Sequence, residues 1–355
     1  MRPSVMMGAL SQPMGPQLMS EVESRVEQAL AGLGSVRNIN ELAGSTAFTA
    51  RLFEVEVDSN ALPDTVVVKL EASDPATQFS AAALQLYARE VNFFRHAAEA
   101  SPLRTPTCFA ADLSDDGMTF HLVLERLVGD NMDQTSGVSG DEAVAVISEV
   151  ARHHRFWAER DIPPGVSLPI NNDLYLAVLP DVMDAGLAVA REQLDVSDAV
   201  VGLTGAVRDQ FADVTGALIG PTPSLCHGDL RAENILVLDN QFAFVDFQVG
   251  THCDPVFDVA YFVTQSVDVD SVADIERDLV RSWSDEAYAG DAQDFDDVWN
   301  RYRLATAFCV AYPLFAAAQG LEDSVRLTQV EQVFARLDRA CQDLDLGSAV
   351  SRPAR

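Results

Sequence analysis

Lysine is almost missing from this chain. Lys69 is the only one among 24 basic residues, against 54 Asp and Glu, which gives a formal net charge of −30. A surface this acidic repels phosphate backbones and anionic headgroups. We therefore expect neither nucleic acid nor a membrane as a partner. Such a surface would attract a cationic substrate, but solvated carboxylates on every exterior face are the simpler explanation of the charge.

Cysteine and long apolar runs are also scarce. The five cysteines are scattered and form no C-x-x-C pair, which argues against a disulfide framework or a zinc knuckle. No run of about 18 uncharged apolar residues occurs, and the first residues lack the order of a signal peptide. We therefore expect reduced thiols and a cytoplasmic location.

The residue pattern in the first third of the chain predicts a sheet with few helices. In Arg51–Asp58 apolar and acidic residues alternate, with Phe53, Val55 and Val57 on one face. We expect a disordered segment over residues 1–17, helices over 18–33 and 80–98, and strands over 51–58, 65–70 and 121–127. Residues 18–127 would then form a first lobe.

After Gly129 the periodicity becomes helical. The spacing predicts helices over 141–159, 173–192, 200–218, 272–287, 295–319 and 325–344. Strands over 235–238 and 242–247, joined at Asp239 and Asn240, predict a hairpin among these helices. Residues 128–347 would form a second lobe, and residues 348–355 a loose tail. The pair His153 and His154 points in directions about 100° apart on a helix, which indicates packing.

Polar residues with the chemistry of a metal site flank this hairpin. The segment from His227 through Asn234 reads His-Gly-Asp-Leu-Arg-Ala-Glu-Asn, and Asp246-Phe247-Gln248 follows twelve residues after Asn234. Carboxylate and carboxamide oxygens at the two ends of one hairpin suit Mg²⁺. Phosphoryl transfer is a chemistry that needs such a set, because a carboxylate orients the acceptor hydroxyl while metal ions bridge the nucleotide phosphates.

The ordered set H-G-D-x-x-x-x-N followed by D-F-Q resembles the aminoglycoside phosphotransferase and choline kinase group of protein-kinase-like enzymes. The glutamine of D-F-Q looks most similar to the ecdysteroid-kinase-like branch. The resemblance implies an α+β, two-lobed kinase-like fold, with a small antiparallel sheet in the first lobe and a helix-rich second lobe. It implies ATP and Mg²⁺ as cofactors, Asp229 as catalytic base, and Asn234 and Asp246 as metal ligands. Arg231 stands where kinases often place a lysine that neutralises the γ-phosphate.

The upstream half fits the same resemblance. Lys69 ends a Val-Val-Val-Lys strand similar to the one whose lysine holds the α- and β-phosphates, and Glu90 is its natural ion-pair partner. Gly44, Ser45 and Thr46 resemble the phosphate-binding loop, and main-chain groups of Glu125 and Leu127 would bond adenine. Asp258 resembles the family residue that begins a helix and braces the catalytic loop, and helix capping is the simpler interpretation.

Two departures from protein kinases favour a small acceptor. Gly228 replaces the arginine of H-R-D, and few residues separate Asp246 from the Asp254-Pro255 turn, so a peptide-binding segment has no room. We therefore predict an ATP-dependent kinase of a small-molecule hydroxyl, either an apolar steroid-like alcohol or an aminoglycoside or choline-like cation. A non-catalytic nucleotide-binding or scaffold protein and a protein kinase are the alternatives. The oligomeric state does not follow from the sequence.

Overall fold

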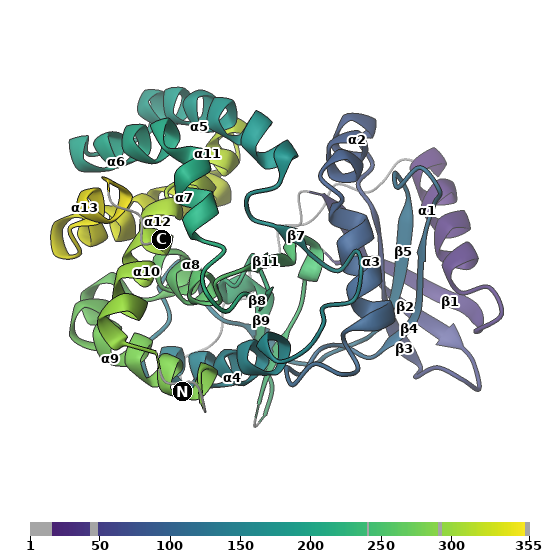
Figure 1. Ribbon diagram of the computed structural model, residues 1–355. Coiled ribbons are helices and arrows are strands. Elements are labelled where there is room, and N and C mark those ends of the chain that lie inside the picture. The colour runs from purple at the N-terminus through teal and green to yellow at the C-terminus, as the bar shows by residue number, and fades with distance from the viewer. Residues whose placement is uncertain (1–15, 43–48, 240, 290–292, 352–355) are drawn as a thin grey trace, which may run out of the picture. The chain divides into compact units, whose positions relative to one another are not determined.

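The computed structural model describes residues 16–42, 49–239, 241–289 and 293–351. The chain divides into two compact units (Figure 1). The first comprises Met1–Glu99 and Thr105–Val128, and the second comprises Ala100–Arg104 and Gly129–Arg355. Most of the segment expected to be disordered, residues 1–15, lies outside the described residues, as does Asn240 of the expected hairpin turn.

The first unit is built on a five-stranded antiparallel sheet of order β1-β2-β3-β5-β4. Its strands are β1 (Ser35–Glu41), β2 (Ala50–Asp58), β3 (Thr65–Glu71), β4 (Cys108–Leu113) and β5 (Phe120–Glu125), and its helices are α1 (Pro16–Ala29), α2 (Pro75–Ala83) and α3 (Leu86–His96). Helices α1 and α3 lie on opposite sides of the sheet (Figure 1).

Strand β3 is buried on both faces because a helix covers each one. Its residues Val66, Val68 and Leu70 join the core beneath α1, together with the expected inward row of β2. Successive side chains of a strand point to opposite faces, so Val67 and Lys69 point to the α3 side. The only lysine of the chain is thereby placed inside the unit, 4% exposed.

The second unit is mostly helical, with two small three-stranded sheets of order β10-β9-β6 and β7-β11-β8. Its helices are α4 (Gly140–Ala158), α5 (Asp173–Gln193), α6 (Asp198–Asp209), α7 (Phe211–Ala217), α8 (Val256–Ser266), α9 (Val269–Ala287), α10 (Phe295–Phe308), α11 (Ala311–Ala318), α12 (Ser324–Asp343) and α13 (Leu346–Ser351). Its strands are β6 (Asp130–Asn131), β7 (Leu168–Pro169), β8 (Ser224–Cys226), β9 (Ile235–Val237), β10 (Phe242–Phe244) and β11 (Thr251–Cys253). Strands β9 and β10 pair antiparallel, which confirms the predicted hairpin.

Three of the expected long helices are each two shorter ones. The predicted helix over 80–98 is α2 and α3, interrupted at Gln85, whose φ of 55° is left-handed. The helix over 200–218 breaks at Gln210, and the helix over 295–319 breaks after Phe308. Apolar periodicity runs through each break because both pieces bury residues of the same unit.

Other differences lie at the ends of elements. Residues 346–351 form α13, where we expected a loose tail from residue 348. Helix α1 ends at Ala29, four residues before the predicted end, and Gly32 has a positive φ in the turn that follows. Strand β5 ends at Glu125, so Leu127 lies just beyond it. In the described part of the chain, no helix is long and apolar enough to span a bilayer.

Candidate active site

Lys69 and Glu90 form a buried ion pair in the first unit, which confirms the pairing predicted from the sequence. Lys69 Nζ lies 2.8 Å from Glu90 Oε1, and the side chains are 5% and 2% exposed. The pair joins β3 to α3, so the sheet and the helix hold the ammonium in one place. A compact, fixed cation of this kind suits a phosphate.

For the other first-unit residues expected at the nucleotide, the structure shows only contacts within that unit. The amide of Glu125 donates to the carbonyl of Thr107, and its carboxylate accepts from the amide and hydroxyl of Thr107. The carbonyl of Leu127 accepts from Arg126. Gly44, Ser45 and Thr46 lie outside the described residues, so the expected phosphate loop stays a prediction.

In the second unit, the hairpin brings Asp229, Asn234 and Asp246 together. The Asn234 amide nitrogen donates to the carbonyl of Asp229 at 2.8 Å and to its Oδ2 at 3.0 Å. The amide of Val245 donates to the carbonyl of Asn234, which ties the two ends of the hairpin side by side. Asp246 has a left-handed φ of 68°, a conformation that is uncommon for aspartate and that clusters at functional sites.

The donor set at this hairpin fits a hard divalent cation. Because both N–H bonds of the Asn234 amide point at Asp229, its Oδ1 is the atom left for a metal ion. The carboxylate of Asp246 supplies further oxygen atoms, and Gln248 steadies one of them with a hydrogen bond of 3.2 Å. Oxygen ligands from a carboxylate and a carboxamide are typical of Mg²⁺ sites.

Arg231 lies between two carboxylates. Its Nε is 3.5 Å from Asp229 Oδ2, and its Nη1 is 3.3 Å from Glu233 Oε2. Burial works against the charged form, but the nearby carboxylates of Asp229, Glu233 and Asp246 raise the pKa of Arg231 above its usual range. The guanidinium is therefore a permanent positive charge beside the expected base. Glu233, which we did not single out from the sequence, holds its other side.

The structure explains why residue 228 is glycine, which the sequence motif alone did not. Its φ is +82°, and a β-carbon built on it would lie 2.1 Å from the carbonyl oxygen of Val249. No side chain fits there without moving backbone. The glycine at the position of the H-R-D arginine therefore follows from close packing between the expected catalytic loop, residues 227–234, and the segment that follows Asp246.

Asp258 braces the catalytic loop, as we expected. Its Oδ2 accepts from the amide of His227 at 2.7 Å and its Oδ1 from the amide of Gly228 at 3.0 Å. Burial alone would raise the pKa of Asp258, but the hydrogen bond from His154 and the amide of Gly228 hold it below the usual range. The capping interpretation is wrong, because Pro255 is the N-cap of α8 and Asp258 lies in the first turn.

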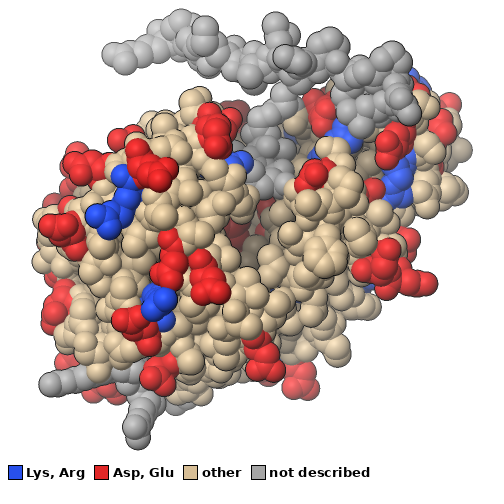
Figure 2. All heavy atoms as spheres, turned by 90° about the horizontal axis from the view of Figure 1, so that it is seen from above, with Lys and Arg blue, Asp and Glu red and all other residues tan. Residues whose placement is uncertain are grey.

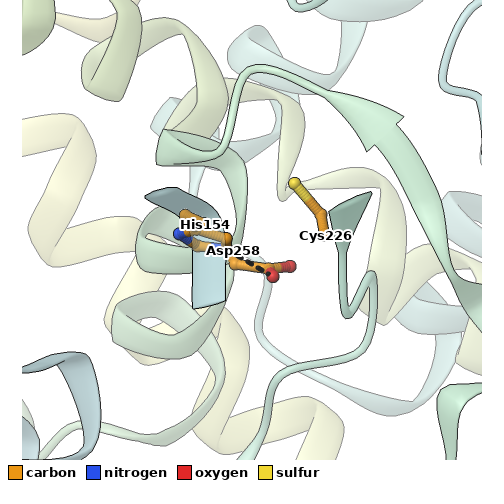
Figure 3. Close-up of side chains that lie close together, drawn as sticks. All are labelled: His154, Cys226 and Asp258. Atoms are coloured by element: carbon orange, nitrogen blue, oxygen red, sulfur yellow. Dashed lines mark hydrogen bonds and ion pairs between the residues drawn. The ribbon is translucent and has the colours of Figure 1, made fainter. Parts of the chain in front are cut away.

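His154, Cys226 and Asp258 are the described histidine, cysteine and acidic residues whose ligand atoms lie close enough for one metal ion (Figure 3). Both nitrogens of His154 are already used. The Trp283 indole N–H can only donate, so His154 Nδ1 accepts it at 3.1 Å, and Nε2–H donates to Asp258. Since both oxygens of Asp258 also have partners, we interpret His154 and Asp258 as a hydrogen-bonded brace, while Cys226 Sγ donates to the carbonyls of Cys253 and Asp254 instead.

His153 is packed, as the helical geometry predicted, with its ring nitrogens bonded to Ser101 and the carbonyl of Leu225. Burial, followed by the neighbouring His154, lowers the pKa of His153 from 6.5 to about 3. Between these values the unfolded chain binds a proton that the folded chain does not. The free energy of unfolding should therefore fall as the pH drops below 6.5, by about 1 kcal/mol per pH unit from this residue.

Urea unfolding between pH 7 and 4 measures this effect, and His153→Gln should flatten the dependence. His96 supplies the matched control, because His96→Gln makes the same substitution at a solvent-exposed position. Equal slopes for the wild type and His153→Gln would show that His153 does not govern the acid limb.

The antiparallel sheet, the helix-rich second unit and the His-Gly-Asp loop with its hairpin define a protein-kinase-like phosphotransferase fold. The chain belongs to the phosphotransferase enzyme family, whose model matches residues 49–304. No curated protein sequence matches the chain at a significant level. The family is therefore established, whereas the ecdysteroid-kinase-like branch stays a prediction.

Three solved structures of similar fold are named as kinases or phosphotransferases. The choline kinase of Cryptosporidium parvum Iowa II has a TM-score of 0.59 at 10% identity, over 92% of this chain and 95% of the other. The GDP complex of a mutant aminoglycoside 2′-phosphotransferase has a TM-score of 0.57 at 14% identity, over 90% and 96%. Amicoumacin kinase hAmiN in complex with AMP-PNP, Ca²⁺ and Ami has a TM-score of 0.57 at 12% identity, over 92% and 96%.

Proposed function

We propose that this phosphotransferase moves the γ-phosphoryl group of ATP to a hydroxyl of a small molecule, with Mg²⁺ as the metal. The observation that carries the proposal is the assembly of Asp229, Asn234 and Asp246 at the hairpin ends, with amide and carboxylate groups fixed by hydrogen bonds. A non-catalytic protein has no need to hold all three together. Two solved neighbours bound to ADP and AMP-PNP support ATP as the donor, whereas the aminoglycoside 2′-phosphotransferase neighbour carries GDP.

Each residue has a role in the proposed reaction. Asp229 orients the acceptor hydroxyl and takes its proton, while Arg231 neutralises charge on the transferring phosphoryl group. Lys69, positioned by Glu90, binds the α- and β-phosphates of ATP. Bound Mg²⁺, held by Asn234 and Asp246, would neutralise the charge of the phosphates. Catalysis then comes from positioning and electrostatic stabilisation.

The acceptor of the phosphoryl group is either an apolar alcohol or a cation, and different features of the protein support each. Next to Tyr261 of α8, whose hydroxyl bonds Asp229, α11 places Tyr312, and Phe315 packs against that ring. Helix α11 carries no charged residue. Aromatic, uncharged neighbours support an apolar alcohol. Acidic residues spread over the face drawn in Figure 2 support a cation instead.

A mass-spectrometric transfer assay tests the function and separates the two acceptor classes. Purified protein with ATP and Mg²⁺ is offered a sterol, a polyketide alcohol, choline and an aminoglycoside. The proposal expects one acceptor to gain a single phosphoryl group, with loss of the product on chelation of the metal. Transfer only to a generic protein would favour a protein kinase. The non-catalytic alternative would be favoured if the protein binds nucleotide but transfers no phosphoryl group to these acceptors, to a metabolite extract or to water.

A further inference from the structure

Helix α8 contacts the catalytic loop through side chains on successive turns. Asp258 accepts from the amides of His227 and Gly228, and Ser266 accepts from the amide of Ala232 at 2.8 Å. Tyr261 lies one turn after Asp258, and all eleven residues of the helix are buried. The helix is therefore fixed against the loop, and it can hold a side chain of the loop at a constant position.

The side chain that α8 reaches is the expected base. Tyr261 Oη donates to Asp229 Oδ1 at 2.5 Å, while the other oxygen, Oδ2, accepts from Asn234. Tyr261 is 4% exposed, and its ring packs edge-on against Tyr312, with centroids 4.5 Å apart. A phenol held so tightly, and at so short a distance, restricts rotation of the Asp229 carboxylate.

Resting on the proposed function, we propose that Tyr261 is a positioning residue that aims the Asp229 carboxylate at the acceptor hydroxyl. In the reaction, the acceptor oxygen forms a bond to the γ-phosphorus and its proton passes to Asp229. The bond from the γ-phosphorus to the bridging oxygen breaks, and ADP leaves. Tyr261 keeps its proton throughout and donates it to Asp229 as a hydrogen bond.

The state of the phenol agrees with this role. Burial, and next the charge of Asp229, raise the pKa of Tyr261 well above its usual value. The hydroxyl therefore stays protonated at neutral pH. The phenol is therefore always able to donate to Asp229 Oδ1, and removing the hydroxyl should leave that carboxylate freer to rotate.

Tyr261→Phe tests the proposal with MgATP alone, using water as the acceptor, and then with any acceptor that the wild type phosphorylates. We expect kcat to fall by about 10- to 100-fold while KM for ATP changes less than twofold. Site-specific 3-fluorotyrosine at position 261, which keeps a hydroxyl able to donate to Asp229, should retain a kcat close to that of the wild type.

Tyr302→Phe is the matched control. Its hydroxyl also donates to a buried carboxylate, Glu276 Oε1, at 2.6 Å, but in α10 and α9 and not at the catalytic loop. It should lower the melting temperature and leave kcat unchanged. An active wild type whose kcat is unchanged in Tyr261→Phe would overturn the role of Tyr261 alone. A wild type that transfers to no acceptor, water included, would overturn the proposed function as well.

Discussion

Replacing Asp229 by alanine should lower phosphoryl transfer by at least about 10³-fold while leaving the fold intact. The loss is large because the carboxylate both orients the acceptor and takes its proton. The fold should persist because Asp258, not Asp229, holds the amides of His227 and Gly228. Steady-state transfer rates and circular dichroism of the same preparation measure both outcomes.

A matched control is available in the same unit. Asp213 is exposed in the short helix α7, so Asp213→Ala removes an equal charge without touching the loop. It should keep the wild-type rate. If Asp229→Ala transfers the phosphoryl group at a near-normal rate, Asp229 is not the base.

Replacing Lys69 by methionine should reduce kcat/KM for ATP by about 100-fold or more, and should also destabilise the first unit. The buried Glu90 carboxylate would lose the ammonium 2.8 Å away, which costs about 3 kcal/mol when one partner of a buried pair is removed. Urea unfolding and ATP kinetics measure the two losses separately.

A double variant distinguishes the structural role of Lys69 from its role in nucleotide binding. Lys69→Met with Glu90→Gln removes the unpaired charge, so part of the stability should return while the activity should not. Arg25→Met, which breaks the ion pair between Arg25 of α1 and Glu71 of β3, should cost stability alone. Recovery of ATP turnover in the double variant would argue against Lys69 as a phosphate ligand.

The elements with clean alternation or amphipathic spacing were predictable from the sequence. The inward row of β2 is an example. Strand β1 was missed because its sequence, Ser-Val-Arg-Asn-Ile-Asn-Glu, is polar and lies at the sheet edge, where little is buried. Periodicity did not show helix α8, which only the resemblance at Asp258 implied, because the helix is buried on every side and has no amphipathic period to detect.

The same contrast explains what the sequence revealed of the site. Asp229, Asn234 and Asp246 follow from a fixed spacing around one hairpin, and the structure brings these residues together. Tyr261 depends on the position of α8 against the loop, and Glu233 on the side chain of Arg231. Spacing along the chain does not encode such contacts. Knowing that a helix covers residues 256–266 would have placed Tyr261 one turn from Asp258.

The claim on which the rest depends is that Lys69 contacts ATP and that this contact requires the Mg²⁺ that Asp246 would hold. Because Lys69 is the only lysine, an ATP derivative with a reactive acyl phosphate can report on it by peptide mass spectrometry. The account predicts one acyl group, on Lys69, which excess MgATP prevents and which falls sharply without Mg²⁺ or in Asp246→Asn. Labelling of Lys69 that is indifferent to Mg²⁺ and to Asp246→Asn in the folded protein would contradict it, as would labelling of the amino terminus alone.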